Sequence, residues 1–192
     1  IPEVDAVLGT TAYDQILDAV DEALKGRSSV RMEDLQRLPK VEAKRQVTTG
    51  GHFAYMKIAE GCDKHCTYCI IPKIRGRFRS RPMEELIREA EELAEQGVKE
   101  LILVAQETTL YGKDLYGEKS LPVLLRKLCK ISGLRWIRVL YCYPEEITDE
   151  LIRVMKEEPK ICHYLDLPIQ HANDDILKRM GGKTSKQELI DI

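Results

Sequence analysis

Residues 83–105 read MEELIREAEELAEQGVKELILVA, and this stretch decides the fold class. Apolar residues recur at helical spacing from Met83 to Gln96, and Gly97 is well placed to end that helix. A continuous apolar strand over residues 100–105 follows directly. A helix joined to a strand that is apolar throughout is typical of a parallel sheet covered by helices.

The alternation of strands and helices extends over the rest of the chain. Apolar patterns predict further strands over residues 53–59, 136–141 and 161–167, and helices over 121–130, 147–156 and 174–180. A helical pattern also begins at Lys186 and runs to Ile192. We therefore expect an α/β domain of about four β-α units over residues 52–192. Right-handed crossovers would curl its sheet into an open doubly wound form or a barrel.

The first 50 residues follow a different pattern. A helix is expected from Ala12 to Leu24, and residues 27–51 are polar and end in Gly50-Gly51, which indicates a linker. Because the chain begins without methionine and stops inside a helical pattern, we expect it to be a piece of a longer protein.

Composition excludes several classes of protein. The 192 residues are 43% hydrophobic and 32% charged, which argues against disorder, and a net charge of −2 argues against a generally basic nucleic-acid-binding protein. No stretch approaches the roughly 18 apolar residues that a membrane-spanning helix needs. Three of the six cysteines crowd into eight residues, which favours metal binding in a reducing, cytoplasmic compartment over disulfides.

Those three cysteines follow the first predicted strand of the domain, in the sequence EGCDKHCTYC at residues 60–69. The C-x3-C-x2-C spacing offers three thiolates from one loop, whereas most cubane iron–sulfur clusters take four. Three ligands would leave one iron open to a substrate or cofactor. A structural zinc site that includes His65 is the alternative, but His65 adjoins Cys66, which makes joint tetrahedral ligation awkward.

From Met56 to Arg81, the sequence resembles the radical S-adenosylmethionine (SAM) loop of the methylthiotransferases. The resemblance implies a partial radical SAM barrel of TIM type and a 4Fe–4S cluster held by Cys62, Cys66 and Cys69. The open iron would bind SAM, and Tyr68 would lie near the adenine. Reductive cleavage of SAM would yield a 5′-deoxyadenosyl radical that takes a hydrogen from the substrate, with the electron coming from a donor such as flavodoxin or ferredoxin.

Three later segments distinguish the branches of that family. AQETTLYG at residues 105–112, LYCYP at 140–144 and YLDLPIQHA at 164–172 are similar to the ribosomal-protein branch rather than the tRNA branch. That likeness implies a transferase that methylthiolates the β-carbon of an aspartate in the twelfth protein of the small ribosomal subunit. The alternatives are a tRNA adenosine methylthiotransferase and a structural metal-binding module that docks on the ribosome.

Four polar residues at predicted strand ends are candidates for cofactor binding: Gln106, Glu107, Asp166 and His171. The superfamily usually contacts the methionine end of SAM after its second strand, so Glu107 could accept a hydrogen bond from the SAM ammonium group. A solvated loop carboxylate and a structural histidine are the plainer interpretations of Glu107 and His171. No catalytic residue is assigned.

A basic run occupies alternate positions after the cysteines: Lys73, Arg75, Arg77, Arg79 and Arg81. In an extended segment these cations would share one face. They could then contact ribosomal RNA, or pair with the acidic helix that follows.

The family resemblance also implies what this chain lacks. Residues 1–26 resemble the end of an N-terminal methylthiotransferase domain that carries a second 4Fe–4S cluster, and a family barrel has six β-α units. We therefore expect this piece alone not to be competent for full turnover.

Overall fold

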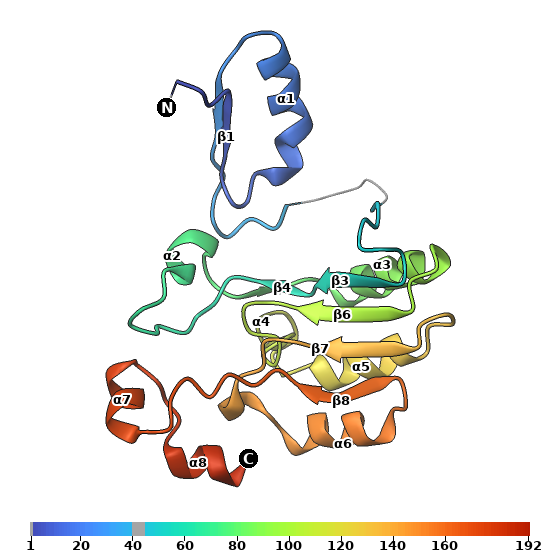
Figure 1. The fold of residues 1–192 in the computed structure, drawn as a ribbon, viewed down its shortest axis with the longest axis vertical. Helices are drawn as coiled ribbons and strands as arrows, with labels where there is room; N and C mark the ends of the chain where they lie inside the picture. Colours follow the sequence, from blue (N-terminus) through green and yellow to red (C-terminus); the bar gives the residue numbers. More distant parts are fainter. Residues whose placement is uncertain (1, 40–44) are drawn as a thin grey trace.

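The computed structural model describes residues 2–39 and 45–192 (Figure 1). Ile1 and residues 40–44, part of the expected linker, lie outside the described residues. Four strands form the central parallel sheet: β3 (Phe53–Lys57), β6 (Glu100–Val104), β7 (Trp136–Val139) and β8 (Ile161–Leu165), in the order β3-β6-β7-β8. Because each strand is added beside the previous one, the sheet progresses in one direction as in a barrel, whereas a doubly wound sheet reverses.

Three helices cover one face of this sheet: α3 (Met83–Glu95), α5 (Leu121–Cys129) and α6 (Asp149–Glu157) (Figure 1). Alternate strand residues point toward them and are fully buried, such as Met56, Leu103 and Ile137. Their neighbours on the opposite face, Tyr55 and Trp136, are exposed. The helices therefore cover one side of the sheet, and on the other side Ile102 of β6 is buried as well. This arrangement confirms the expected α/β fold of a partial barrel.

Polar side chains determine where several helices begin. Thr148 accepts a hydrogen bond from the Leu151 amide at 3.2 Å and so caps α6, which for that reason starts two residues after the expected Ile147. The side chains of Asn173 and Ser185 cap the two last helices in the same way, α7 (Asp174–Arg179) and α8 (Lys186–Asp191).

Several short elements were not expected from the sequence. The predicted strand over 53–59 ends at Lys57, and the next residues form β4 (Ala59–Glu60), which pairs antiparallel with β5 (Arg79–Ser80). Two short helices also occur, α2 (Ile71–Arg75) and α4 (Lys113–Tyr116). None of the described helices is long and apolar enough to cross a membrane.

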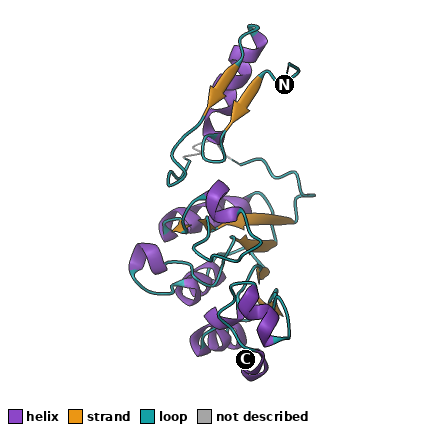
Figure 2. Ribbon diagram, turned by 90° about the vertical axis from the view of Figure 1, so that its left-hand side faces the viewer, coloured by secondary structure: helices purple, strands orange, loops and turns teal. Residues whose placement is uncertain are grey.

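The N-terminal part forms a β-α-β unit. Strands β1 (Ala6–Leu8) and β2 (Ser29–Arg31) pair in parallel, with α1 (Ile16–Leu24) between them in the chain (Figure 2). The expected helix over 12–24 is thus α1 preceded by a 3-10 turn. Strand β2 lies inside the segment expected to be a linker, so this unit extends at least to Arg31.

Candidate functional site

The cysteine loop, residues 61–70, joins β4 to α2 at the carboxyl ends of the sheet strands (Figure 1). Cys62 is buried, and Cys66 and Cys69 are half-buried. All three are free thiols. Burial raises the pKa of Cys62, and the charges of Glu107, Cys66 and Cys69 raise it further. The three thiols therefore lie close enough to influence one another electrostatically.

Gly61 sets the path of the chain into this loop. Its φ of +80° belongs to the left-handed region, and a Cβ at this position would lie 2.1 Å from the carbonyl oxygen of Arg77. Its amide donates to Oε1 of Gln106 at 2.8 Å, and the Cys62 amide donates to the carbonyl of Gly76 at 3.2 Å. Gln106, a predicted cofactor contact, is thus engaged with the backbone of the loop.

The far side of the loop is attached to the C-terminal segment of the chain. The Thr67 amide donates to the carbonyl of Met180 at 3.0 Å, and its hydroxyl donates to the carbonyl of Arg179 at 3.3 Å. The phenol of Tyr68 donates to Oε1 of Gln170 at 2.5 Å. Gln170 was not identified from the sequence, although it immediately precedes the predicted His171.

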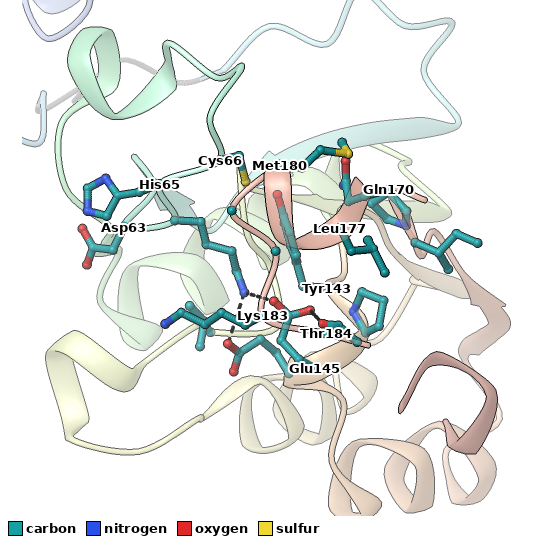
Figure 3. Close-up of a pocket in the computed structure, with 18 of the residues that line it drawn as sticks. Asp63, His65, Cys66, Tyr143, Glu145, Gln170, Leu177, Met180, Lys183 and Thr184 are labelled. Carbon is teal, nitrogen blue, oxygen red and sulfur yellow. Dashed lines mark hydrogen bonds and ion pairs between the residues drawn. The ribbon is translucent and has the colours of Figure 1, made fainter. Parts of the chain in front are cut away.

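A cavity of about 520 Å³ lies against the cysteine loop (Figure 3). Cys66 and Tyr68 line it from the loop, Tyr143 and Glu145 from the end of β7, and Met180 from the end of α7. Its walls combine ring faces and charged groups, as a site for a mixed polar and apolar ligand requires.

A group of ion pairs centred on Lys64 lies under the loop. The ammonium is 2.7 Å from Oε1 of Glu145, 3.3 Å from Oε1 of Glu146 and 3.6 Å from Oε2 of Glu107. It also lies 4.2 Å from the centre of the Tyr143 ring. Burial lowers the pKa of Lys64, but its hydrogen bond to Glu145 and the charges of the neighbouring carboxylates raise it overall. Sequence reasoning missed this group because its members are far apart in the chain.

Glu107 is completely buried at the end of β6. Its Oε1 accepts hydrogen bonds from the amide and hydroxyl of Thr109, and its Oε2 has no hydrogen-bond partner among the described residues. Burial raises the pKa of this carboxyl to about 7. Glu107 is not among the residues that line the cavity. Its predicted contact with SAM stays a prediction, and the solvated-loop interpretation is wrong because the side chain is inaccessible.

The two remaining candidates are also outside the cavity lining. Asp166 accepts a hydrogen bond at Oδ2 from the amide of Tyr141 at 3.0 Å and so supports the positive φ of 59° there. His171 is exposed, and its Nδ1 accepts from the Asn173 amide at 3.0 Å. Their role as cofactor ligands stays a prediction.

The basic run does not share one face, contrary to expectation. Helix α2 contains Lys73 and Arg75, so the segment is not extended throughout. Arg79 is buried and donates to the carbonyls of Arg75 and Arg77. Of the expected pairs with the acidic helix α3, Arg81 makes one, at 2.7 Å from Glu89.

The donor set of the loop suits an iron–sulfur cluster. Figure 3 shows the His65 ring pointing away from Cys66, so the expected alternative of joint zinc ligation by His65 finds no support. In residues 2–39 and 45–192, no group of three or more His, Cys, Asp or Glu side chains is arranged to hold a metal ion, and this includes the three loop cysteines; the case for a cluster therefore rests on the kind and spacing of the donors. Thiolates from one loop are the ligands that iron–sulfur clusters take.

A family model describing the radical SAM superfamily matches residues 56–192, which include the loop, the cavity and all of the sheet except the first three residues of β3. The chain belongs to the radical SAM superfamily. Among solved structures, the radical SAM methyltransferase TsrM from Kitasatospora setae, with cobalamin and a [4Fe-4S] cluster bound, has a TM-score of 0.64 at 16% identity and covers 95% of this chain and 42% of its own. The cobalamin-dependent radical enzyme OxsB has a TM-score of 0.56 at 15% identity, over 71% of this chain and 21% of its own. Both likenesses confirm the fold.

Curated relatives confirm the resemblance to methylthiotransferases. The chain is 65% identical over 190 residues to the ribosomal protein uS12 methylthiotransferase RimO of Lachnoclostridium phytofermentans, covering 99% of this chain and 43% of that protein. It is 54% identical over 191 residues to RimO of Clostridium perfringens (strain SM101 / Type A), with the same coverage. This radical SAM chain thus spans less than half the length of the curated relatives that it matches.

Proposed function

We propose that the chain is the cluster- and SAM-binding part of a methylthiotransferase that modifies ribosomal protein uS12. The observation that carries the proposal is the set of three thiols on one loop, beside a cavity at the carboxyl ends of barrel strands. The substrate is inferred from the two RimO relatives. The proposed reaction attaches a methylthio group to the β-carbon of an aspartate.

Cys62, Cys66 and Cys69 are the proposed ligands of a 4Fe–4S cluster with one open iron, at which SAM binds. When bound, the cluster and SAM together supply the radical chemistry that replaces an unactivated C–H bond. A second 4Fe–4S cluster belongs to the rest of the protein in this proposal.

The residues around the cavity have separate proposed tasks. Tyr68 is 59% exposed, and its hydrogen bond to Gln170 holds an aromatic face at the cavity, where the adenine can stack. Gln106 holds the Gly61 amide and so fixes the start of the cysteine loop.

The proposal extends to domains and partners. Residues 52–192 are assigned to the radical SAM core. The N-terminal unit, expected to end at residue 26, is extended to Arg31 because β2 pairs with β1, and it is assigned to the end of a preceding domain. The electron donor is proposed to be a flavodoxin or ferredoxin. Lys73 and Arg77 are the exposed cations of the basic run, and Arg77 lies 3.6 Å from Asp63; these two are the proposed contacts for ribosomal RNA.

The test is anaerobic reconstitution of the full-length protein with iron and sulfide, followed by electron paramagnetic resonance with and without SAM. A 4Fe–4S signal that shifts with SAM is expected. Since the full-length protein is expected to hold a second cluster, Cys62→Ala should remove the SAM-dependent shift and one cluster's worth of iron. Cys129→Ala is the matched control, because Cys129 is a buried thiol of α5 outside the loop.

The substrate is tested by mass spectrometry of uS12 and of tRNA after incubation with the reconstituted protein. A mass increase on the uS12 aspartate peptide supports the proposal. Methylthiolated tRNA adenosine with unmodified uS12 would overturn the substrate assignment. Stoichiometric zinc with no cluster would overturn the radical mechanism and favour a structural metal module.

A further inference from the structure

Lys64 lies between Cys62 and Cys66 but points away from solvent, and its side chain is only 17% exposed. Three carboxylates surround its ammonium, and they come from two different strand ends: Glu107 follows β6, whereas Glu145 and Glu146 follow β7. A single cation on the cysteine loop therefore connects that loop to both neighbouring strands of the sheet.

The carboxylates have few other partners. Glu107 Oε2 has no hydrogen-bond partner among the described residues, and it forms an ion pair with Lys64 at 3.6 Å. Glu145 also accepts from the hydroxyl of Thr184 at 3.0 Å, and Glu146 pairs with Lys119 at 2.8 Å. Without the Lys64 ammonium, three carboxylates would stand close together with one cation left, so Glu145 and Glu146 would be expected to separate.

The rest of the loop is held by backbone hydrogen bonds at Gly61, Cys62, Thr67 and Cys69. These bonds fix its two ends, to Gln106 and Gly76 on one side and to Met180 on the other.

The Asp63 carboxylate also accepts a hydrogen bond from the Phe78 amide at 3.2 Å and lies 3.6 Å from Nε of Arg77. Lys64 is the more buried of two charged attachments, because its side chain is 17% exposed whereas that of Arg77, the ion-pair partner of Asp63, is 80% exposed. Since charge-assisted hydrogen bonds are about twice as strong as neutral ones and exposed ion pairs contribute little, loss of Lys64 should affect the loop more than loss of Arg77.

We propose that Lys64 is a positioning residue that holds the cysteine loop against the ends of β6 and β7, so that the three thiols are in place before a cluster is inserted. Its partners Glu107, Glu145 and Glu146 are the fixed side of this attachment. The buried carboxylate of Glu107 thus pairs with a cation of the loop and is not solvated. The inference rests on the proposed function only in taking the three thiols as cluster ligands.

The experiment compares backbone hydrogen exchange of residues 61–69 in the full-length apo-protein, at peptide resolution, for wild type and variants. Lys64→Met removes the charge while keeping the length of the side chain. We expect exchange at the hydrogen-bonded amides of the loop to rise by about tenfold or more, the effect of losing one hydrogen bond to a charged group. Lys64→Arg should restore exchange to near the wild-type rate.

Lys119→Met is the matched control. Lys119 lies in the segment before α5, and among the described residues its ammonium pairs with the same Glu146 and with no residue of the cysteine loop. Its exchange profile over 61–69 should equal that of wild type. If Lys64→Met fails to fold, Glu145→Gln tests the same attachment through its shortest ion pair.

A second readout is the rate of Cys62 alkylation, followed by mass spectrometry. Loss of a nearby cation disfavours the thiolate and by itself slows alkylation, so a faster rate in Lys64→Met must come from opening of the loop. Unchanged exchange in Lys64→Met, or an equal change in Lys119→Met, would overturn the proposal. Both readouts use apo-protein, so failure of wild type to take up a cluster would count against the proposed function alone.

Discussion

Replacing Gly61 by alanine should displace the start of the cysteine loop. The backbone there has φ +80°, and a Cβ would lie 2.1 Å from the carbonyl oxygen of Arg77 and 2.7 Å from that of Gly76. Both obstacles are backbone atoms, which cannot rotate away as a side chain could. The chain must therefore move, and the hydrogen bonds from the Gly61 and Cys62 amides must lengthen or break.

The magnitude follows from these two effects. The left-handed conformation costs an alanine about 1–2 kcal/mol. Loss of the two hydrogen bonds adds about 1 kcal/mol each. We therefore expect Gly61→Ala to lower the free energy of unfolding by about 3–4 kcal/mol.

Gly117→Ala is the matched control, because Gly117 has φ +81° and, among the described residues other than its chain neighbours, no heavy atom lies within 4 Å of its would-be Cβ. It carries the conformational cost alone, about 1–2 kcal/mol. Urea unfolding of both variants, followed by the fluorescence of Trp136 on β7, gives the difference directly. Equal destabilisation by the two substitutions would refute the close approach of Gly61 to the 76–77 backbone.

Three further predictions concern the core, a helix cap and a buried acid. Leu124→Ala should lower the free energy of unfolding by about 2–5 kcal/mol, measured in urea, because Leu124 is fully buried on α5. Thr148→Ala should lower the free energy of unfolding by about 1 kcal/mol through loss of the α6 cap, whereas Thr148→Ser keeps the hydroxyl and should keep most of that stability. Equal destabilisation by the two substitutions would contradict the capping role. Burial raises the pKa of Glu107 in the folded protein to about 7, against about 4.5 in the unfolded chain. Glu107 therefore stabilises the fold below pH 4.5, and this stabilisation is lost as the pH rises to 7 and above. The free energy of unfolding should fall by up to about 3 kcal/mol over this range. Urea unfolding at several pH values between 4.5 and 7 should show a smaller fall in the free energy of unfolding for Glu107→Gln than for wild type. The same pH dependence in both proteins would refute the raised pKa.

Much of the fold could be predicted because it rests on repeated local patterns. The predicted helix over 83–96 corresponds to α3 at 83–95, and the strand over 100–105 to β6 at 100–104. A helix that buries one face needs an apolar residue at every third or fourth position, and this spacing can be recognised in the sequence. The cysteine spacing was equally readable, because the three proposed ligands lie in a single loop.

The short elements could not be predicted for the opposite reason. Strands β1, β2, β4 and β5 contain only two or three residues each, too few to show a period. Their strand conformation depends on a partner elsewhere in the chain. The same effect misled the interpretation of the basic run, since α2 bends a segment that alternation alone described as extended.

Sequence by itself therefore determined the β-α order, the presence of a parallel sheet covered by helices and the loop that carries the three thiols, because all of these depend on neighbours a few residues apart. Tertiary structure alone decided what surrounds that loop. Glu145 lies 81 residues from Lys64 and Gln170 lies 102 residues from Tyr68, yet each pair is in hydrogen-bond contact. Such contacts exist only because parallel strands bring their carboxyl ends to one edge of the sheet, and no local pattern records which side chains meet there.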